Sequence, residues 1–141
     1  MIMKTLPLYH KPRKKRATPE ASLQKAVVQY LRVAGVPGVL FFSVPNEAKR
    51  SPRLANHLKA MGMLPGVSDL VICVPESCVI FLELKAKGEK PSRAQDDFAK
   101  CATASGHYWT WADNIEDAIT ILQNGGAIKP VSRRSLLSRA A

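Results

Sequence analysis

The chain has 141 residues, enough for one ordinary domain, and its 46% hydrophobic content is sufficient for a buried core. It carries 21 Lys and Arg against 11 Asp and Glu, a formal net charge of +10, which indicates a polyanionic partner such as nucleic acid or, less often, an anionic membrane surface. No apolar run approaches the roughly 20 residues of a membrane span, and the N-terminus lacks the apolar core of a signal peptide. We therefore expect a soluble, cytoplasmic protein without a membrane partner.

The first third of the chain reads as a basic arm, a helix, a strand and a second helix. Residues 1–17 contain the run KPRKKR, and Thr18-Pro19 then has the chemistry of a helix start that leads to an end near Gly35. Residues 39–44, VLFFSV, are rich in strand-forming residues. After a polar loop, Ser51-Pro52 can open a short helix that ends near Gly62.

The rest of the chain predicts a hairpin followed by helix, strand and helix. Residues 69–74 and 79–86 are apolar on both faces and are joined by PESC, a pattern typical of an antiparallel hairpin inside a covered sheet. Capping-box spacings at Ser92–Gln95 and Asp113–Glu116 open two further helices on either side of the strand HYWTW. The sequence therefore predicts an α/β layer architecture, with a basic arm at 1–17, a folded domain at 18–126 and a basic tail at 127–141.

Two charged residues interrupt the second strand of this hairpin. Glu83 and Lys85 share one face of the strand because side chains alternate, and Asp69 begins the partner strand beside its end. The flanking Leu82 and Leu84 argue against an exposed position, so some function must offset the desolvation of these charges. Two carboxylates can ligate Mg²⁺ or a similar ion, which activates water against a phosphodiester, and an ammonium can stabilise the developing charge.

At these residues the sequence resembles the PD-(D/E)xK nucleases, with Asp69 at the first acidic position and Glu83-Leu84-Lys85 as the ExK triplet. The surrounding LQKAVVQYLR, VPN, GVSDL, FLELKAKGEKPSRAQ and a Gly-aromatic strand occur in the order expected of the VRR-NUC branch. The resemblance covers roughly residues 20–124. One departure is Ser68, where the family usually has a proline that supplies backbone stiffness and no ligand.

The resemblance implies a restriction-endonuclease-like fold, with a central mixed sheet flanked by helices, and a Mg²⁺- or Mn²⁺-dependent endodeoxyribonuclease. It implies Asp69 and Glu83 as metal ligands and Lys85 as the catalytic lysine, with Glu20 as a further carboxylate and Gln95 as a supporting residue. Short members of this kind are often bacterial or phage proteins and are thought to act as homodimers on branched DNA such as Holliday junctions. The bacterial host cytoplasm is the location that follows.

Each site residue also has a purely structural interpretation. Glu83 and Lys85 could form an ion pair at a strand end, and Asp69 could be a turn residue. Glu20 would be favoured in a first helical turn by the helix dipole alone, and Gln95 is where a capping box would place it.

Basic residues surround the predicted site, and the basic run in the arm could equally be a solvated tail. We expect nonspecific contacts with DNA phosphates from Lys11, Arg13, Lys14, Lys15, Arg16, Lys49, Arg50, Arg53, Lys87, Lys90 and Arg93. Two other functions remain open on the sequence alone. One is a flap or single-strand nuclease with the same chemistry, and the other is a DNA-binding accessory protein without catalytic activity.

Overall fold

The computed structural model describes residues 17–45 and 49–130, and the helices and strands follow the predicted order. The elements are α1 (Pro19–Ala34), β1 (Leu40–Ser43), α2 (Pro52–Ala60), β2 (Leu70–Cys73), β3 (Val79–Leu84), α3 (Arg93–Ala104), β4 (Tyr108–Ala112) and α4 (Ile115–Asn124).

The predicted helix starts are confirmed by their capping bonds. Thr18 Oγ1 accepts from the backbone N–H of Ala21 at 3.2 Å, and Ser51 Oγ accepts from that of Leu54 at 3.3 Å. The proline that follows each cap lies in the first turn, where its missing N–H removes no helical hydrogen bond. α1 and α2 therefore begin where the sequence chemistry places them.

The four strands form one sheet in the order β1-β2-β3-β4. β1 and β2 pair antiparallel, β2 and β3 form the predicted antiparallel hairpin, and β4 adds parallel to β3. The parallel pairing requires a crossover, which α3 supplies. β2 and β3, the two strands with apolar residues on both faces, are thus the two inner strands, as their composition predicts.

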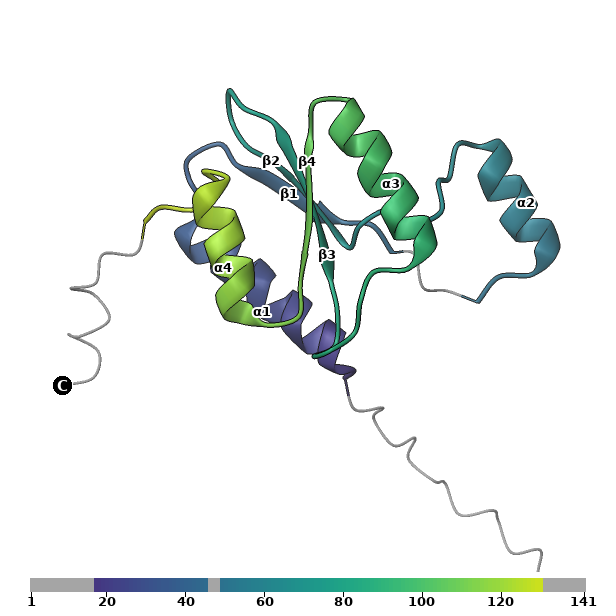
Figure 1. The fold of residues 1–141 in the computed structure, drawn as a ribbon, viewed down its shortest axis with the longest axis horizontal. Coiled ribbons are helices and arrows are strands. Elements are labelled where there is room, and N and C mark those ends of the chain that lie inside the picture. The colour runs from purple at the N-terminus through teal and green to yellow at the C-terminus, as the bar shows by residue number, and fades with distance from the viewer. Residues whose placement is uncertain (1–16, 46–48, 131–141) are drawn as a thin grey trace, which may run out of the picture.

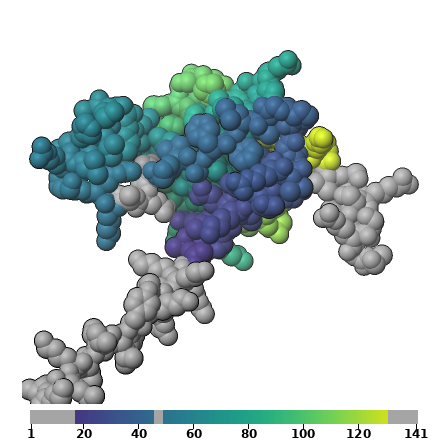
Figure 2. Space-filling model, turned by 180° about the vertical axis from the view of Figure 1, so that it is seen from behind, coloured from purple at the N-terminus to yellow at the C-terminus, as the bar shows by residue number. Residues whose placement is uncertain are grey.

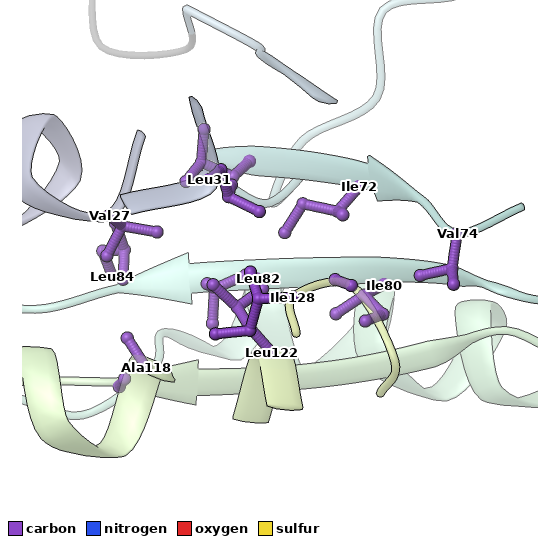
Figure 3. Close-up of a cluster of buried hydrophobic side chains, with 13 residues drawn as sticks. Val27, Leu31, Ile72, Val74, Ile80, Leu82, Leu84, Ala118, Leu122 and Ile128 are labelled. Atoms are coloured by element: carbon purple, nitrogen blue, oxygen red, sulfur yellow. The ribbon is translucent and has the colours of Figure 1, made fainter. Parts of the chain in front are cut away.

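Helices cover both faces of the sheet (Figure 1). α1 and α4 lie against one face, where Leu31 of α1, Leu122 of α4 and Leu82 of β3 belong to the main buried cluster (Figure 3). α3 lies against the other face, where Phe98 packs edge-on against Phe81 of β3 with ring centroids 5.1 Å apart. β3 therefore has the main core on one side and α3 on the other.

α2 stands apart from this sandwich and has no buried residue. Seen from behind in Figure 2, its residues form a separate lobe at one end of the molecule. Leu54 within it, and Met61 and Leu64 after it, are exposed by 45%, 72% and 51%. Within the described ranges, no helix has the length and apolarity needed to cross a membrane.

Two details of the C-terminal third correct the sequence analysis. The helix predicted to start with an Asp113–Glu116 capping box is instead capped by Asn114, whose Oδ1 accepts from the N–H of Asp117 at 2.8 Å. The tail does not begin at residue 127, because Ala127 and Ile128 are buried in the main core. The predicted arm, apart from residue 17, and residues 131–141 of the predicted tail lie outside the described residues.

Candidate active site

The candidate site lies where β3 ends. Glu83 points toward the α3 face of the sheet, on the same side of the strand as Phe81. Leu70 of β2 pairs with Leu82, so continuing this register by one residue sets Asp69 opposite Glu83. The hairpin therefore brings the two carboxylate-bearing positions together across neighbouring strands, as the sequence predicts.

Glu83 is 2% exposed and its two carboxylate oxygens have different surroundings. Oε1 accepts from Gln95 Nε2 at 2.5 Å and from Lys85 Nζ at 2.9 Å. Oε2 is buried and has no hydrogen-bond partner among the described residues. An unsatisfied buried oxygen on a charged group is costly, so it marks a position where an electrophile would be stabilised.

Burial is the largest influence on Glu83 and raises the pKa of this carboxyl from its ordinary 4.5 to about 7. The hydrogen bond from Lys85 lowers the pKa, while the negative charge of Asp69 raises it. Burial has the largest single effect on Lys85 as well, and it lowers the pKa of this group. The hydrogen bond to Glu83 and the negative charge of Glu83 together raise the pKa by more than burial lowers it. With further support from the charges of Glu20 and Asp69, the net pKa of Lys85 is raised, so Lys85 stays an ammonium at neutral pH.

The side chains of Asp69 and Glu20 each accept a hydrogen bond from a backbone N–H at or just after the end of β3. Asp69 Oδ2 accepts from the N–H of Leu84 at 2.8 Å, and Glu20 Oε1 accepts from that of Ala86 at 3.3 Å. Glu20 reaches this position because the N-terminal end of α1 lies beside the strand's end (Figure 1). The first helix therefore does contribute a carboxylate next to Lys85.

Gln95 combines the two roles that the sequence left as alternatives. Its Oε1 accepts from the N–H of Ser92 at 2.7 Å, completing the capping box of α3, while its Nε2 donates to Glu83. The start of α3 is thereby fixed relative to the carboxylate. A cap residue that also reaches a buried acid holds that acid in one rotamer.

The carboxylates suit a hard divalent cation. Oε2 of Glu83 is available as a ligand, and Asp69 directly precedes the adjacent strand, β2. Across residues 17–45 and 49–130, no three His, Cys, Asp or Glu side chains are grouped closely enough to hold a metal together. Glu20 is thus not gathered with Asp69 and Glu83 into a three-carboxylate cluster, and its Oε1 is already bonded to backbone. A Mg²⁺-type ion accepts such a two-carboxylate site because it retains several waters.

The predicted phosphate-binding residues fall into three groups. Lys87, Lys90 and Arg93 are exposed on the connection from β3 to α3 and on the first residue of α3, directly after Lys85. Lys49 and Arg53 are exposed near or on α2, whereas Arg50 is half-buried and its Nη1 lies 3.4 Å from Met63 Sδ. The third group, Lys11, Arg13, Lys14, Lys15 and Arg16, lies outside the described residues.

Two neighbours of the site were not identified from the sequence. Trp111 of β4 pairs in register with Glu83, so it is the flanking residue on the parallel side. Asp113 follows β4, and its Oδ2 accepts from the N–H of Gly88 at 3.1 Å. The sequence predicts a capping role for Asp113, and only the parallel pairing of β3 and β4, which sequence periodicity does not reveal, brings it to this loop.

No family model matches the sequence, and no curated protein matches it. Two solved structures are similar in fold. One, described as a VRR_NUC domain, superposes with a TM-score of 0.54 at 18% identity, over 76% of this chain and 97% of that one. The other, a VRR_NUC domain protein, gives a TM-score of 0.59 at 21% identity, over 75% of this chain and 86% of that one. The chain therefore has the fold of these VRR_NUC domains, the α/β restriction-endonuclease-like fold that its sequence predicts.

Proposed function

We propose that this chain is a VRR-NUC nuclease that hydrolyses DNA phosphodiester bonds with the help of Mg²⁺ or Mn²⁺. The observation that carries the proposal is the buried Oε2 of Glu83, which has no hydrogen-bond partner among the described residues and lies beside the Lys85 ammonium and across from Asp69. The shared fold and the net charge of +10 support a nucleic-acid substrate. A divalent ion held by Asp69 and Glu83 would polarise the phosphate and lower the pKa of an attacking water.

Each protein group then has a defined task. Gln95 and Lys85 both bond to Oε1 of Glu83, and so turn Oε2 toward the reacting centre. Lys85, protonated at neutral pH, is a donor to oxygens that gain negative charge and is not the base that deprotonates water. The water oxygen bonds to phosphorus and its proton passes to solvent, while the bond from phosphorus to the leaving oxygen breaks and that oxygen takes up a proton from solvent.

For the substrate we propose branched DNA, and for the assembly a homodimer that places two sites on one junction. Both rest on the resemblance to VRR-NUC nucleases. A flap or single-strand nuclease with the same site is the alternative specificity. Light scattering with and without a four-way junction tests the assembly, and a strictly monomeric protein on the junction would contradict paired cleavage.

The decisive experiment incubates the protein with labelled four-way-junction, flap, duplex and single-stranded DNA in Mg²⁺, Mn²⁺ or EDTA. We compare Asp69→Ala and Lys85→Ala with Lys100→Ala, a matched control whose side chain is 80% exposed on α3. Metal-dependent cleavage by wild type and the control, lost in both site variants while DNA binding persists, is the expected result. Binding without cleavage on every substrate and metal would instead favour a DNA-binding accessory protein.

A further inference from the structure

A tight turn follows the candidate catalytic lysine. The N–H of Glu89 donates to the carbonyl of Ala86 at 2.9 Å, which closes a four-residue turn. Gly88, at its third position, has φ of +82°, and Lys87 at the second position does not have a positive φ. These features define a type II turn, in which glycine is favoured at the third position.

The central peptide of this turn is held by Asp113. Types I and II differ by a flip of the peptide between the second and third residues, and the N–H of Gly88 belongs to that peptide. Asp113 Oδ2 accepts from this N–H at 3.1 Å. The contact therefore selects the orientation of the peptide that follows Lys87, and with it the type of turn.

Asp113 is itself fixed by its neighbours. Asn114 Nδ2 donates to Asp113 Oδ1 at 2.9 Å, and Asn114 is the N-cap of α4. The N–H of Gly88 most strongly, then the side chain of Asn114, holds the pKa of Asp113 below its ordinary value, with a smaller contribution from the charge of Lys87. The acceptor is thus ionised at neutral pH and anchored to the start of a helix that packs on the core.

The turn is also tied to the candidate site at its beginning. The N–H of Lys85 donates to the carbonyl of Ala112 at 3.0 Å, and that of Ala86 donates to Glu20. Lys87 and Lys90 are exposed immediately after these fixed points. A short segment therefore joins the candidate catalytic lysine to two cations that face solvent.

We propose that Asp113 is a positioning residue of the DNA interface, which holds the Ala86–Glu89 turn so that Lys87 and Lys90 meet the phosphates next to the bond being cut. This inference rests on the proposed nuclease function. It assigns Asp113 a role in binding without contact with DNA. Because the backbone of the turn is already held, binding does not have to order it, and less conformational entropy is lost when the complex forms.

The charge of Asp113 and its proposed positioning role predict opposite changes in DNA affinity when Asp113 is removed, which makes the proposal testable. A carboxylate near a polyanion repels it, so removing an acid that has no other role should leave affinity equal or tighter. Removing the anchor of the turn should weaken binding. Asp97→Ala is the matched control, because Asp97 is 65% exposed on α3 and its only ion pair is a long 4.0 Å contact with Lys100 within the described residues.

The experiment measures binding of fluorescent duplex and junction DNA by anisotropy in EDTA, across a series of salt concentrations. We expect Asp113→Ala to bind about two- to tenfold more weakly than Asp97→Ala, the range for loss of one hydrogen bond. Asp113→Asn keeps an acceptor oxygen and should recover part of the loss. Lys87→Ala should lower the slope of log K against log salt by about 0.9, whereas Asp113→Ala should keep the wild-type slope because the phosphate contacts remain.

Gly88→Ala is a second variant that loosens the same turn by another route. A Cβ at Gly88 meets no atom within 4 Å, so the change strains only the positive φ. It should weaken binding as Asp113→Ala does, and the double variant should be less than additive. Thermal melts of each variant check that the fold is intact.

Binding by Asp113→Ala as tight as, or tighter than, that of Asp97→Ala would overturn the inference. Since binding is measured without metal, its outcome is separate from that of cleavage. If wild type binds but never cuts, the nuclease proposal fails while the comparison of Asp113 with Asp97 still decides the positioning role. If wild type cuts and the two variants bind alike, the positioning role fails alone. A wild type that does not bind DNA overturns both.

Discussion

Replacing Glu83 with Gln in the metal-free protein should change the pH dependence of stability in a predictable direction. The folded protein keeps a proton on Glu83 up to about pH 7, whereas an unfolded chain releases it near 4.5. Between these values the folded state binds more protons than the unfolded state, so wild-type stability falls as pH rises. Glutamine does not titrate, and this loss is absent in the variant.

The magnitude follows from the difference between the two pKa values. A tenfold change in a proton-binding constant corresponds to about 1.4 kcal/mol, so the full shift of Glu83 corresponds to about 3 kcal/mol. Most of this, about 2 to 3 kcal/mol, is lost by the wild type between pH 5 and pH 8. The Gln amide also places a donor where Oε2 was unpartnered, a cost that does not vary with pH.

The assay is urea unfolding of wild type and Glu83→Gln in EDTA at several values between pH 5 and pH 8. The quantity of interest is the difference in unfolding free energy between the two proteins, because contributions from titrating groups that do not interact with Glu83 cancel in it. That difference should move by about 2 to 3 kcal/mol in favour of the variant as pH rises. A difference that is flat across the range, or that moves in favour of wild type, would refute the assignment of a raised pKa to Glu83.

Two further predictions concern the start of α3. Gly66 and Gly62 both have a positive φ, of +77° and +96°. A Cβ at Gly66 would collide with the carbonyl of Ala94, whereas a Cβ at Gly62 meets nothing within 4 Å. Gly66→Ala should therefore lower the free energy of unfolding by about 2 kcal/mol more than Gly62→Ala does. Equal unfolding free energies for the two variants would show that the close approach is unimportant. Ser92→Ala removes the cap of α3 and should lower the free energy of unfolding by about 1 kcal/mol. A variant as stable as wild type would count against the cap.

Local chemistry in the sequence was sufficient for most of the fold. Cap residues such as Thr18 and Ser92 define helix starts through side-chain bonds spanning three residues, which a sequence displays directly. The hairpin was readable because its two apolar runs are joined by a short connection, and its register then set Asp69 opposite Glu83. The proximity of Asp69 and Glu83 was predictable because it follows from the pairing of these two strands.

What the sequence did not reveal depends on contacts between distant segments. Asp113 and Asn114 are adjacent and both are good caps, so local preference cannot decide which one starts the helix. Asn114 becomes the cap, and Asp113 instead bonds to Gly88, 25 residues away, because β4 lies parallel to β3. Ala127 and Ile128 look like the beginning of a tail after two glycines, yet they fill the core beneath α1 and α4.

The alternation of side chains along β3 links the candidate site to the core in a further way. Ile80, Leu82 and Leu84 face the main cluster, and the charged pair occupies the positions between and after them. A slip of one residue in this strand would turn Glu83 into the hydrocarbon core and expose leucines toward α3. Such an error would unfold the domain as well as abolish the site. Burial of the apolar residues of β3 fixes the register of the strand and, with it, the positions of the charged residues. Only a chain with the correct register folds, so every folded molecule has its charged pair in the right place.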